Sequence, residues 1–192
     1  MLAACPADIA KIAVERAVRR EFRGLDFGTA EAFYAAFFSR MASILRLKPA
    51  KAGMLRNWYF SRYLPGMRRV LEKHYRAHPD TASLLTALCA AEVPVSIYSD
   101  YPETGGRMKA VGLPPDEFGI KAECLFGPEN FGALKPAERP FRLIAEAMSV
   151  PVESVLVVGD RDDTDGEGAR CAGMQFLLIG GKRRRRNNAI CS

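Results

Sequence analysis

The sequence of 192 residues lacks the features that would assign it to a membrane, zinc-binding or exported class. No apolar run approaches the roughly 20 residues that a membrane-spanning helix needs. Residues 1–10 lack the basic start and apolar stretch of a signal peptide. The five cysteines are scattered and form no Cys-x-x-Cys pair, so we expect no zinc site and a reducing, cytoplasmic setting. Together these absences predict a soluble chain with no membrane partner.

Histidine is also scarce, since His74 and His78 are the only two in the chain. Their i, i+4 spacing would place both on one face of a helix, where two side chains can bind one metal ion. Pro79 follows directly, however, and no third ligand is nearby in the sequence. A surface helix end is therefore the favoured interpretation.

The formal net charge of +6 is concentrated near the C-terminus. The run from Lys182 to Arg186 supplies five of the 28 basic residues, and no acid follows it. The preceding residues carry 23 basic against 22 acidic groups, which is a net charge of +1. A terminal run of this kind is typical of a solvated tail. We therefore expect residues 182–192 to form a disordered basic tail, and we predict no nucleic-acid partner.

Residues 1–77 show helical patterns and nothing that alternates like a strand. A helix is predicted over residues 8–22, and Thr29 is suited to cap a second one. Residues 57–63 and 67–75 predict further helices, split by Pro65-Gly66. Aromatic side chains here could line a ligand pocket, but packing between helices explains them more simply. These aromatic residues include Phe33, Phe37, Phe38, Trp58 and Tyr59.

Residues 78–181 alternate between helical and strand patterns. Helices are expected over 80–91, with Asp80 as its cap, and over 103–111, 139–149 and 164–174. Strands are expected over 93–98, 121–126, 155–158 and 175–179. This alternation predicts an α/β fold with a doubly wound parallel sheet, in which all strand ends meet at one edge.

A cluster of carboxylates follows the third predicted strand, beyond Gly159. Its members are Asp160, Asp162, Asp163 and Asp165. Close carboxylates repel one another by roughly 1 kcal/mol or more per pair, which favours a divalent, oxygen-seeking cation. The carboxyl edge of a parallel sheet is also where ligands bind. A calcium loop is a weaker interpretation, because Gly166 falls one place off the EF-hand spacing.

Two further polar residues are expected at the same edge. Ser99 follows the first predicted strand, and Lys135 lies in a loop before a helix. A hydroxyl donor, a fixed cation and a metal-binding carboxylate are the groups needed to hold a phosphoryl group. Each residue alone is a weak signal, but their order and spacing together form a stronger one.

In this order the motifs resemble those of the haloacid dehalogenase-like (HAD) hydrolase superfamily, over residues 80–180. The segment from Tyr98 to Pro102 resembles its second motif, whose Ser or Thr hydrogen-bonds a phosphoryl oxygen. Leu134-Lys135-Pro136 is similar to the third, whose Lys steadies the phosphate. Gly159-Asp160, with Asp165 five residues on, resembles the fourth, which binds magnesium.

The resemblance implies a magnesium-dependent phosphohydrolase that acts on a small phosphorylated metabolite. Ser99, Asp100 and Lys135 would bind phosphate, and Ser99 and Lys135 would serve catalysis. Asp160 would bind Mg²⁺, with Asp165 supporting that site. The Asp-rich fourth motif favours phosphohydrolases over true dehalogenases, which need no metal. Residues 1–77 would be the helical cap that many members insert after their first motif.

The nucleophile motif of the superfamily, Asp-x-Asp-x-Thr at the end of the first strand, has no counterpart here. The segment 25–29 imitates only its end, with Phe27 in place of the second carboxylate. Asp160 to Thr164 fits the pattern but follows the other motifs. By resemblance, the missing strand would lie between those ending at Ser99 and Gly159. We therefore expect an α/β core that is missing its first strand.

Two functional hypotheses follow from that expectation. In the first, the chain is an N-terminally shortened enzyme that is inactive as it stands. In the second, it is a non-catalytic relative that binds a ligand or partner through the same edge. An uncovered sheet edge would also allow homo-oligomers to form.

Overall fold

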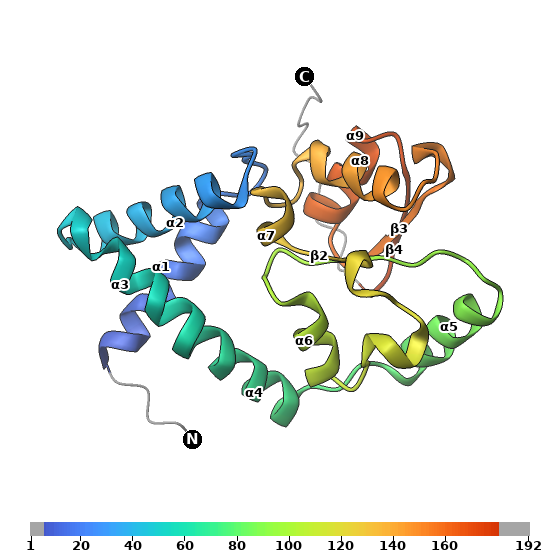
Figure 1. The fold of residues 1–192 in the computed structure, drawn as a ribbon, viewed down its shortest axis with the longest axis horizontal. Helices are drawn as coiled ribbons and strands as arrows, with labels where there is room; N and C mark the ends of the chain where they lie inside the picture. The colour runs from blue at the N-terminus through green and yellow to red at the C-terminus, as the bar shows by residue number, and fades with distance from the viewer. Residues whose placement is uncertain (1–5, 181–192) are drawn as a thin grey trace.

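The computed structural model describes residues 6–180 and contains an all-helical part followed by a mixed part (Figure 1). Helices α1 to α4 lie on the left of Figure 1, and the remaining helices lie with the four strands on the right. The mixed helix and strand content agrees with the predicted α/β class. The predicted basic tail lies outside the described residues.

The first two helices follow the sequence pattern closely. Helix α1 spans Pro6–Glu21, and α2 spans Ala30–Ile44. The Thr29 side chain accepts a hydrogen bond of 3.2 Å from the backbone N–H of Ala32. This bond satisfies a donor that would otherwise lack a partner at the start of α2, so the predicted cap is confirmed.

The predicted break at Pro65-Gly66 is wrong. After a short 3₁₀ turn at Pro49–Lys51, helix α3 (Ala52–Trp58) continues through a π-helical turn at Tyr59–Tyr63 into α4 (Leu64–His74). Proline is tolerated in the first turn of a helical segment, because its missing N–H needs no partner there. The wider π turn directly before α4 gives Pro65 such a position.

Aromatic side chains form the core of the helical part. Phe33, Phe37 and Tyr59 are fully buried, and stacked or edge-to-face contacts join them to their neighbours. Trp58 and Phe38 belong to the same buried cluster. The interpretation that these aromatics pack between helices agrees with this arrangement. Leu134 from the mixed part is buried in the same cluster, so the two parts share a core.

The mixed part contains four short strands in two parallel pairs. Strand β1 (Ile97–Tyr98) pairs with β2 (Leu125–Phe126), with Tyr98 opposite Phe126. Strand β3 (Leu156–Gly159) pairs with β4 (Gln175–Leu178), with Leu156 opposite Gln175. Within residues 6–180 no bridge joins one pair to the other. The strands are parallel as expected, but a single doubly wound sheet stays a prediction.

Four helices of the mixed part agree with the predicted positions to within a few residues, namely α5 (Pro79–Ala90), α6 (Thr104–Ala110), α8 (Glu138–Ala147) and α9 (Glu167–Cys171). The short helix α7 (Pro128–Phe131) was not predicted. The cap of α5 is His78 rather than Asp80, because the ring Nδ1 of His78 accepts from the Asp80 N–H at 3.3 Å. Since α4 ends at His74, the two histidines do not share a helix, and both are exposed.

The β3–β4 pair is covered on one face only, among the described residues. Val157 and Phe176 point toward α8 and α9, where they pack against Phe141, Ala169 and Ala172. The alternate residues of these strands are exposed, including Leu156 at 53% and Leu177 at 49%. A buried doubly wound sheet has helices on both faces. In the part of the chain that is described, the β3–β4 pair has helices on one face only.

Polar contacts also hold the helical part against the mixed part. The backbone of Asp26 forms an isolated antiparallel bridge with Ala133. The Asp26 carboxylate accepts two hydrogen bonds from Arg139 at the start of α8, of 2.6 and 2.7 Å. These contacts set the position of the loop that contains Lys135.

No helix within residues 6–180 combines the length and apolar character needed to cross a bilayer. Among the described residues, Cys89 and Cys124 have free thiols. The reducing setting inferred from the cysteine pattern stays a prediction.

Candidate functional site

Lys135 and Asp165 form a largely buried ion pair beside the end of β3. The Nζ of Lys135 lies 2.6 Å from Oδ1 of Asp165, and the two side chains are 14% and 10% exposed. Asp165 lies on a π-helical turn, Asp162–Gly166, that follows β3 directly. Gly159 at the end of β3 gives this carboxylate room, since a Cβ there would lie only 2.6 Å from the Asp165 Cβ.

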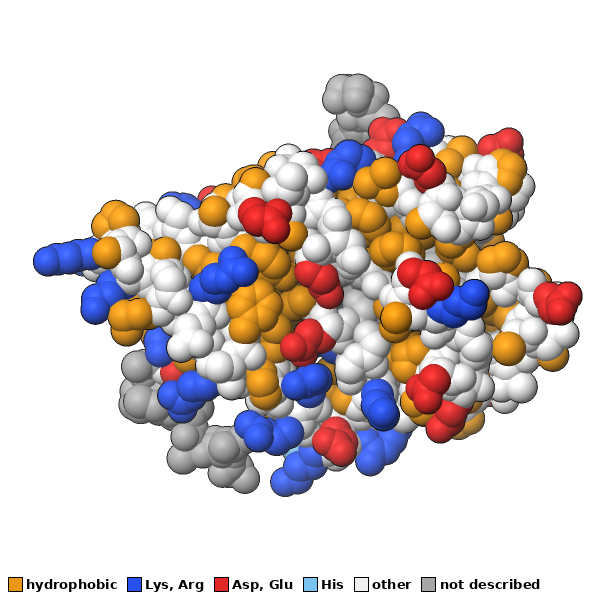
Figure 2. Space-filling model, in the orientation of Figure 1, with side chains coloured by type: hydrophobic (Ala, Val, Ile, Leu, Met, Phe, Trp, Pro, Cys, Tyr) orange, Lys and Arg blue, Asp and Glu red, His pale blue; other side chains and the backbone are white. Residues whose placement is uncertain are grey.

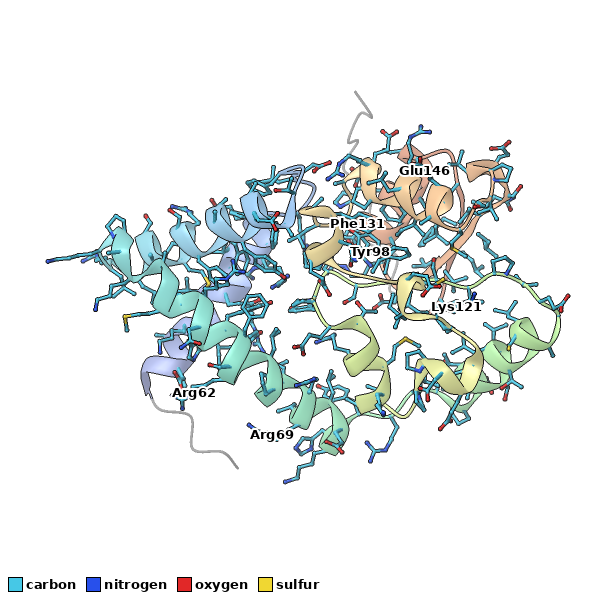
Figure 3. All side chains as sticks on the ribbon, viewed as in Figure 1. Arg62, Arg69, Tyr98, Lys121, Phe131 and Glu146 are labelled. Carbon is cyan, nitrogen blue, oxygen red and sulfur yellow. The ribbon has the colours of Figure 1, made fainter. Side chains whose placement is uncertain are left out.

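The same lysine also contacts the end of β1. Its Nζ donates to the carbonyl of Tyr98 at 3.3 Å, and its backbone N–H donates to Oδ1 of Asp100 at 2.9 Å. Figure 3 shows Tyr98 beside Phe131, where α7 meets the strands, and their rings pack edge to face. The segments that contain Ser99, Lys135 and Asp165 therefore converge at one place, although they are 30 or more residues apart in sequence.

Ser99 lies at this convergence but makes a local contact. Its Oγ accepts a hydrogen bond of 3.0 Å from the backbone N–H of Tyr101. A hydroxyl that accepts one bond still has its own O–H to donate. Ser99 is thus held by the turn after β1 and retains a donor for a ligand.

Asp100 is a half-buried carboxylate next to two cationic side chains. Burial raises its pKa above the usual value, while the ammonium of Lys135 acts in the opposite direction. Arg19 from α1 donates to the Asp100 backbone carbonyl. Asp100 therefore helps to set the position of Lys135 through the backbone of the loop.

The acidic cluster after β3 divides into one buried residue and three at the surface. Asp165 turns inward to Lys135, whereas Asp160 is exposed. Asp162 pairs with Arg170 at 2.8 Å, and Asp163 pairs with Arg161 at 2.6 Å. Over the described residues, no three His, Cys, Asp or Glu side chains group closely enough to hold a metal ion. The cluster is therefore not a preformed metal cage.

Magnesium does not require such a cage. It commonly keeps several water ligands and binds through one or two carboxylates together with phosphate oxygens. Asp160 directly follows β3, and Asp165 lies on the π-helical turn that comes next, so these residues fit a Mg²⁺ ion held chiefly by water and phosphate. The assignment of Mg²⁺ to Asp160 and Asp165 stays a prediction.

The sequence interpretation missed a buried polar cluster beside this site. Glu15 and Arg19 of α1 are 0% and 6% exposed, and an Arg19 nitrogen lies 2.6 Å from a Glu15 oxygen. Arg19 also donates to the Tyr59 hydroxyl at 2.8 Å, and Tyr63 donates to Glu15 at 3.1 Å. The i, i+4 spacing of Glu15 and Arg19 was a signal for their pairing, but nothing in the sequence indicated their burial.

Arg19 links this cluster to the turn after β1. Burial lowers the pKa of Arg19, but Tyr59 and Glu15 outweigh that effect and raise it overall. Its guanidinium lies 4.2 Å from the ring centre of Tyr101, and that of Arg107 lies 4.7 Å from the same ring. The turn that contains Ser99 is therefore fixed from the side of the helical part.

Basic side chains also gather near Arg107. Figure 2 shows Lys and Arg along the lower edge of the molecule, where α4 and α6 lie in Figure 1. The basic residues of these helices are Arg68, Arg69, Lys73, Arg107 and Lys109. The charge outside the tail is nearly neutral on average, but its basic residues are concentrated along this edge.

The C-terminal part of this site matches a known family. Residues 133–189 match a family model described as HAD-hydrolase-like, a range that contains Lys135, Asp160 and Asp165 but not Ser99. No curated protein matches the chain.

Proposed function

We propose that this chain is a haloacid dehalogenase-like hydrolase-fold protein, as the match of residues 133–189 supports, and that its site binds the phosphoryl group of a small phosphorylated metabolite. The observation that carries the proposal is the position of Lys135 between the ends of β1 and β3. An ammonium group has three N–H donors. Asp165 and the Tyr98 carbonyl accept two of them within the described residues, so one remains for an anion.

We propose further that binding depends on magnesium. Lys135 contributes one positive charge, whereas Asp100 and Asp165 contribute two negative charges when both are ionised. A phosphate dianion would be repelled by this excess of negative charge. A Mg²⁺ ion held by Asp160, Asp165 and the phosphate would reverse the sign of the local charge and supply Lewis-acid stabilisation.

Turnover is not part of the proposal for this chain. Hydrolysis through a covalent intermediate requires a carboxylate that is free to attack phosphorus. The two carboxylates that contact Lys135 are both engaged, since Asp100 accepts its backbone N–H and Asp165 pairs with its Nζ. We therefore propose a phosphoryl-binding site that does not hydrolyse its ligand.

Titration calorimetry with inorganic phosphate, with and without Mg²⁺, tests this proposal. We expect binding that Mg²⁺ strengthens at least tenfold and that Lys135→Met abolishes. Lys121→Met is the matched control, because Lys121 is exposed and lies away from Tyr98 in Figure 3. Binding that is the same in both variants would refute the assignment of Lys135. Magnesium-dependent release of phosphate from p-nitrophenyl phosphate would show that the site is catalytic after all.

A further inference from the structure

Arg107 on helix α6 has no anionic partner in the described part of the chain. Its side chain is half-buried, and its guanidinium lies over the ring of Tyr101, 4.7 Å from the ring centre. Within residues 6–180 its N–H donors reach no oxygen acceptor in a hydrogen bond or an ion pair. A positive charge that is partly removed from water is costly unless a counter-charge or an acceptor compensates it. The guanidinium of Arg107 is therefore available to an anion from outside the chain.

The carboxylates around the start of α6 already have other partners. Glu15 pairs with Arg19 at 2.6 Å, and Glu103, directly before α6, lies 3.4 Å from a nitrogen of Arg68. Glu129 accepts the backbone N–H of Glu103 at 2.9 Å. These three side chains therefore leave the guanidinium on α6 without a counter-charge.

The electrostatic surroundings of Arg107 are also unfavourable for its positive charge. Burial lowers the pKa of Arg107, and the nearby cation of Arg19 acts in the same direction. The groups that act in the opposite direction are the side chains of Tyr101, Tyr59 and Tyr63. Burial raises the pKa of Tyr59 and of Tyr63 above the usual value, and a phenol carries no charge at neutral pH. An anion beside Arg107 would supply the missing compensation.

Arg107 and Lys135 both contact the short turn that follows β1. The backbone N–H of Lys135 donates to Asp100, whereas Arg107 lies over the next residue, Tyr101. The backbone N–H of Tyr101 donates in turn to the Ser99 hydroxyl oxygen at 3.0 Å. Two residues of chain span at most about 7 Å. One small molecule can therefore extend from the proposed phosphoryl site at Lys135 to Arg107.

A ligand can reach Arg107 from solvent. Arg107 and Tyr101 are half-buried, so part of each side chain is accessible. Helix α6 lies against α4 at the junction of the helical and the mixed parts (Figure 1). The basic side chains along this edge in Figure 2 give it a positive potential, which attracts anions.

We propose that Arg107 binds a carboxylate of the same ligand whose phosphoryl group Lys135 binds, so that the ligand is a small phosphorylated carboxylic acid. This inference rests on the proposed function. A guanidinium donates two parallel N–H bonds to a carboxylate. The single negative charge of a carboxylate balances that of Arg107, whereas a second phosphoryl dianion would leave an excess. Arg107 thus selects phosphorylated acids over phosphate esters that lack a second anionic group.

Calorimetry with pairs of phosphonates, which cannot be hydrolysed like phosphate esters, tests this inference. One member of each pair has a terminal carboxylate and the other has a methyl group in its place, as in 3-phosphonopropionate and propylphosphonate. Pairs with one to four methylene groups between phosphorus and the terminal group cover a range of lengths. With Mg²⁺ present, we expect the carboxylate member of at least one pair to bind at least tenfold more tightly. Equal affinities in every pair would overturn this inference alone, whereas failure of every phosphonate to bind would refute the proposed function with it.

The ratio of the two affinities isolates the role of Arg107, because a disturbed phosphoryl site would weaken both members of a pair alike. Arg107→Met should reduce this ratio to about one. Arg107→Lys should keep part of it, since an ammonium retains the charge but not the fork. Lys109→Met is the matched control, because Lys109 is exposed on the same helix, and it should keep the native ratio. A native ratio in Arg107→Met, or an equal loss in Lys109→Met, would overturn the inference.

The Nε–H signal of Arg107 gives an independent measurement by NMR on the native chain. The carboxylate member of the selective pair should shift this signal, whereas the alkyl member should leave it nearly unchanged. This measurement needs no variant, so it decides the question if Arg107→Met does not fold. An unchanged signal while the carboxylate member binds more tightly would assign the selectivity to another cation and overturn the inference.

Discussion

The Lys135 ammonium and the Asp165 carboxylate lie 2.6 Å apart, and each is largely buried. Lys135 lies in a loop that the helical part holds in place, whereas Asp165 belongs to the turn after β3. Their contact brings together the ends of β1 and β3, two strands that share no hydrogen bonds among residues 6–180. This ion pair therefore performs the connecting role that strand pairing would have in a continuous sheet.

We expect Lys135→Met to lower the free energy of unfolding by about 3 kcal/mol, because it leaves Asp165 buried without its partner. The double variant Lys135→Met/Asp165→Asn should regain part of that loss, since no uncompensated charge remains. Urea denaturation of the native chain and the variants measures the coupling. The exposed pair of Arg142 and Glu138 is the control, and Glu138→Gln should cost no more than about 0.5 kcal/mol. Losses that simply add in the double variant would contradict direct coupling.

Gly159→Ala should displace the Asp165 carboxylate. The added methyl would lie 2.6 Å from both Cβ and Oδ2 of Asp165, closer than real contacts of this kind. We expect a loss of about 1–3 kcal/mol in unfolding free energy and weaker phosphate binding. Gly66→Ala in α4 is the matched control. Nothing lies within 4 Å of its Cβ, so it should stabilise the protein by up to about 1 kcal/mol. Equal effects of the two substitutions would contradict the close approach of Asp165.

The sequence predicted the helices well because their signals are local. Thr29 precedes an apolar pattern of helical period, and the structure confirms both the cap and the helix. The break at Pro65 was wrong because a local rule about proline could not include the π turn that precedes it. The strands were found in the right order, but β1 and β2 are shorter than predicted. Strand length depends on neighbours that the local sequence does not specify.

The candidate site was predictable in part, since parallel strands end at one edge. Ser99, Asp100, Lys135 and Asp165 do lie close together, whereas Asp160 is exposed. Which carboxylate of the cluster turns inward depends on the π-helical turn at 162–166, a rare conformation with no sequence pattern of its own. The contribution of Arg19 could not be predicted, because it depends on how α1 packs against a turn some 80 residues away.

Arg19→Met should destabilise the helical part and loosen the turn that contains Ser99. The substitution leaves Glu15 buried without its cation and removes the donors to Tyr59 and Asp100. We expect the free energy of unfolding to fall by about 3 kcal/mol. Lysine should not rescue this loss, because one ammonium cannot reproduce the planar, forked donors of a guanidinium.

Thermal unfolding of Arg19→Met and Arg19→Lys measures these effects. Arg16→Met is the control, because Arg16 lies on the exposed side of the same helix, and it should change the free energy of unfolding by less than about 0.5 kcal/mol. Full rescue by Arg19→Lys would contradict the forked geometry. A destabilised Arg19→Met protein with unchanged phosphate affinity would restrict the role of Arg19 to folding.

The contact between Asp26 and Arg139 predicts a loss of stability in acid. Hydrogen bonds from Arg139 hold the pKa of Asp26 below its usual value of 3.8. A carboxyl whose pKa is lowered by folding stabilises the folded state above its unfolded pKa, and this contribution disappears as the pH falls through the folded pKa. The free energy of unfolding of the native chain should therefore exceed that of Asp26→Asn by about 1 kcal/mol at pH 7. The difference is small because the pair is partly exposed. That advantage should shrink only below about pH 4.

Urea denaturation between pH 2.5 and pH 7 measures the difference, with Asp116→Asn at an exposed position as the control. A difference that does not diminish at all as the pH falls to 2.5 would show that it does not arise from the charge of Asp26.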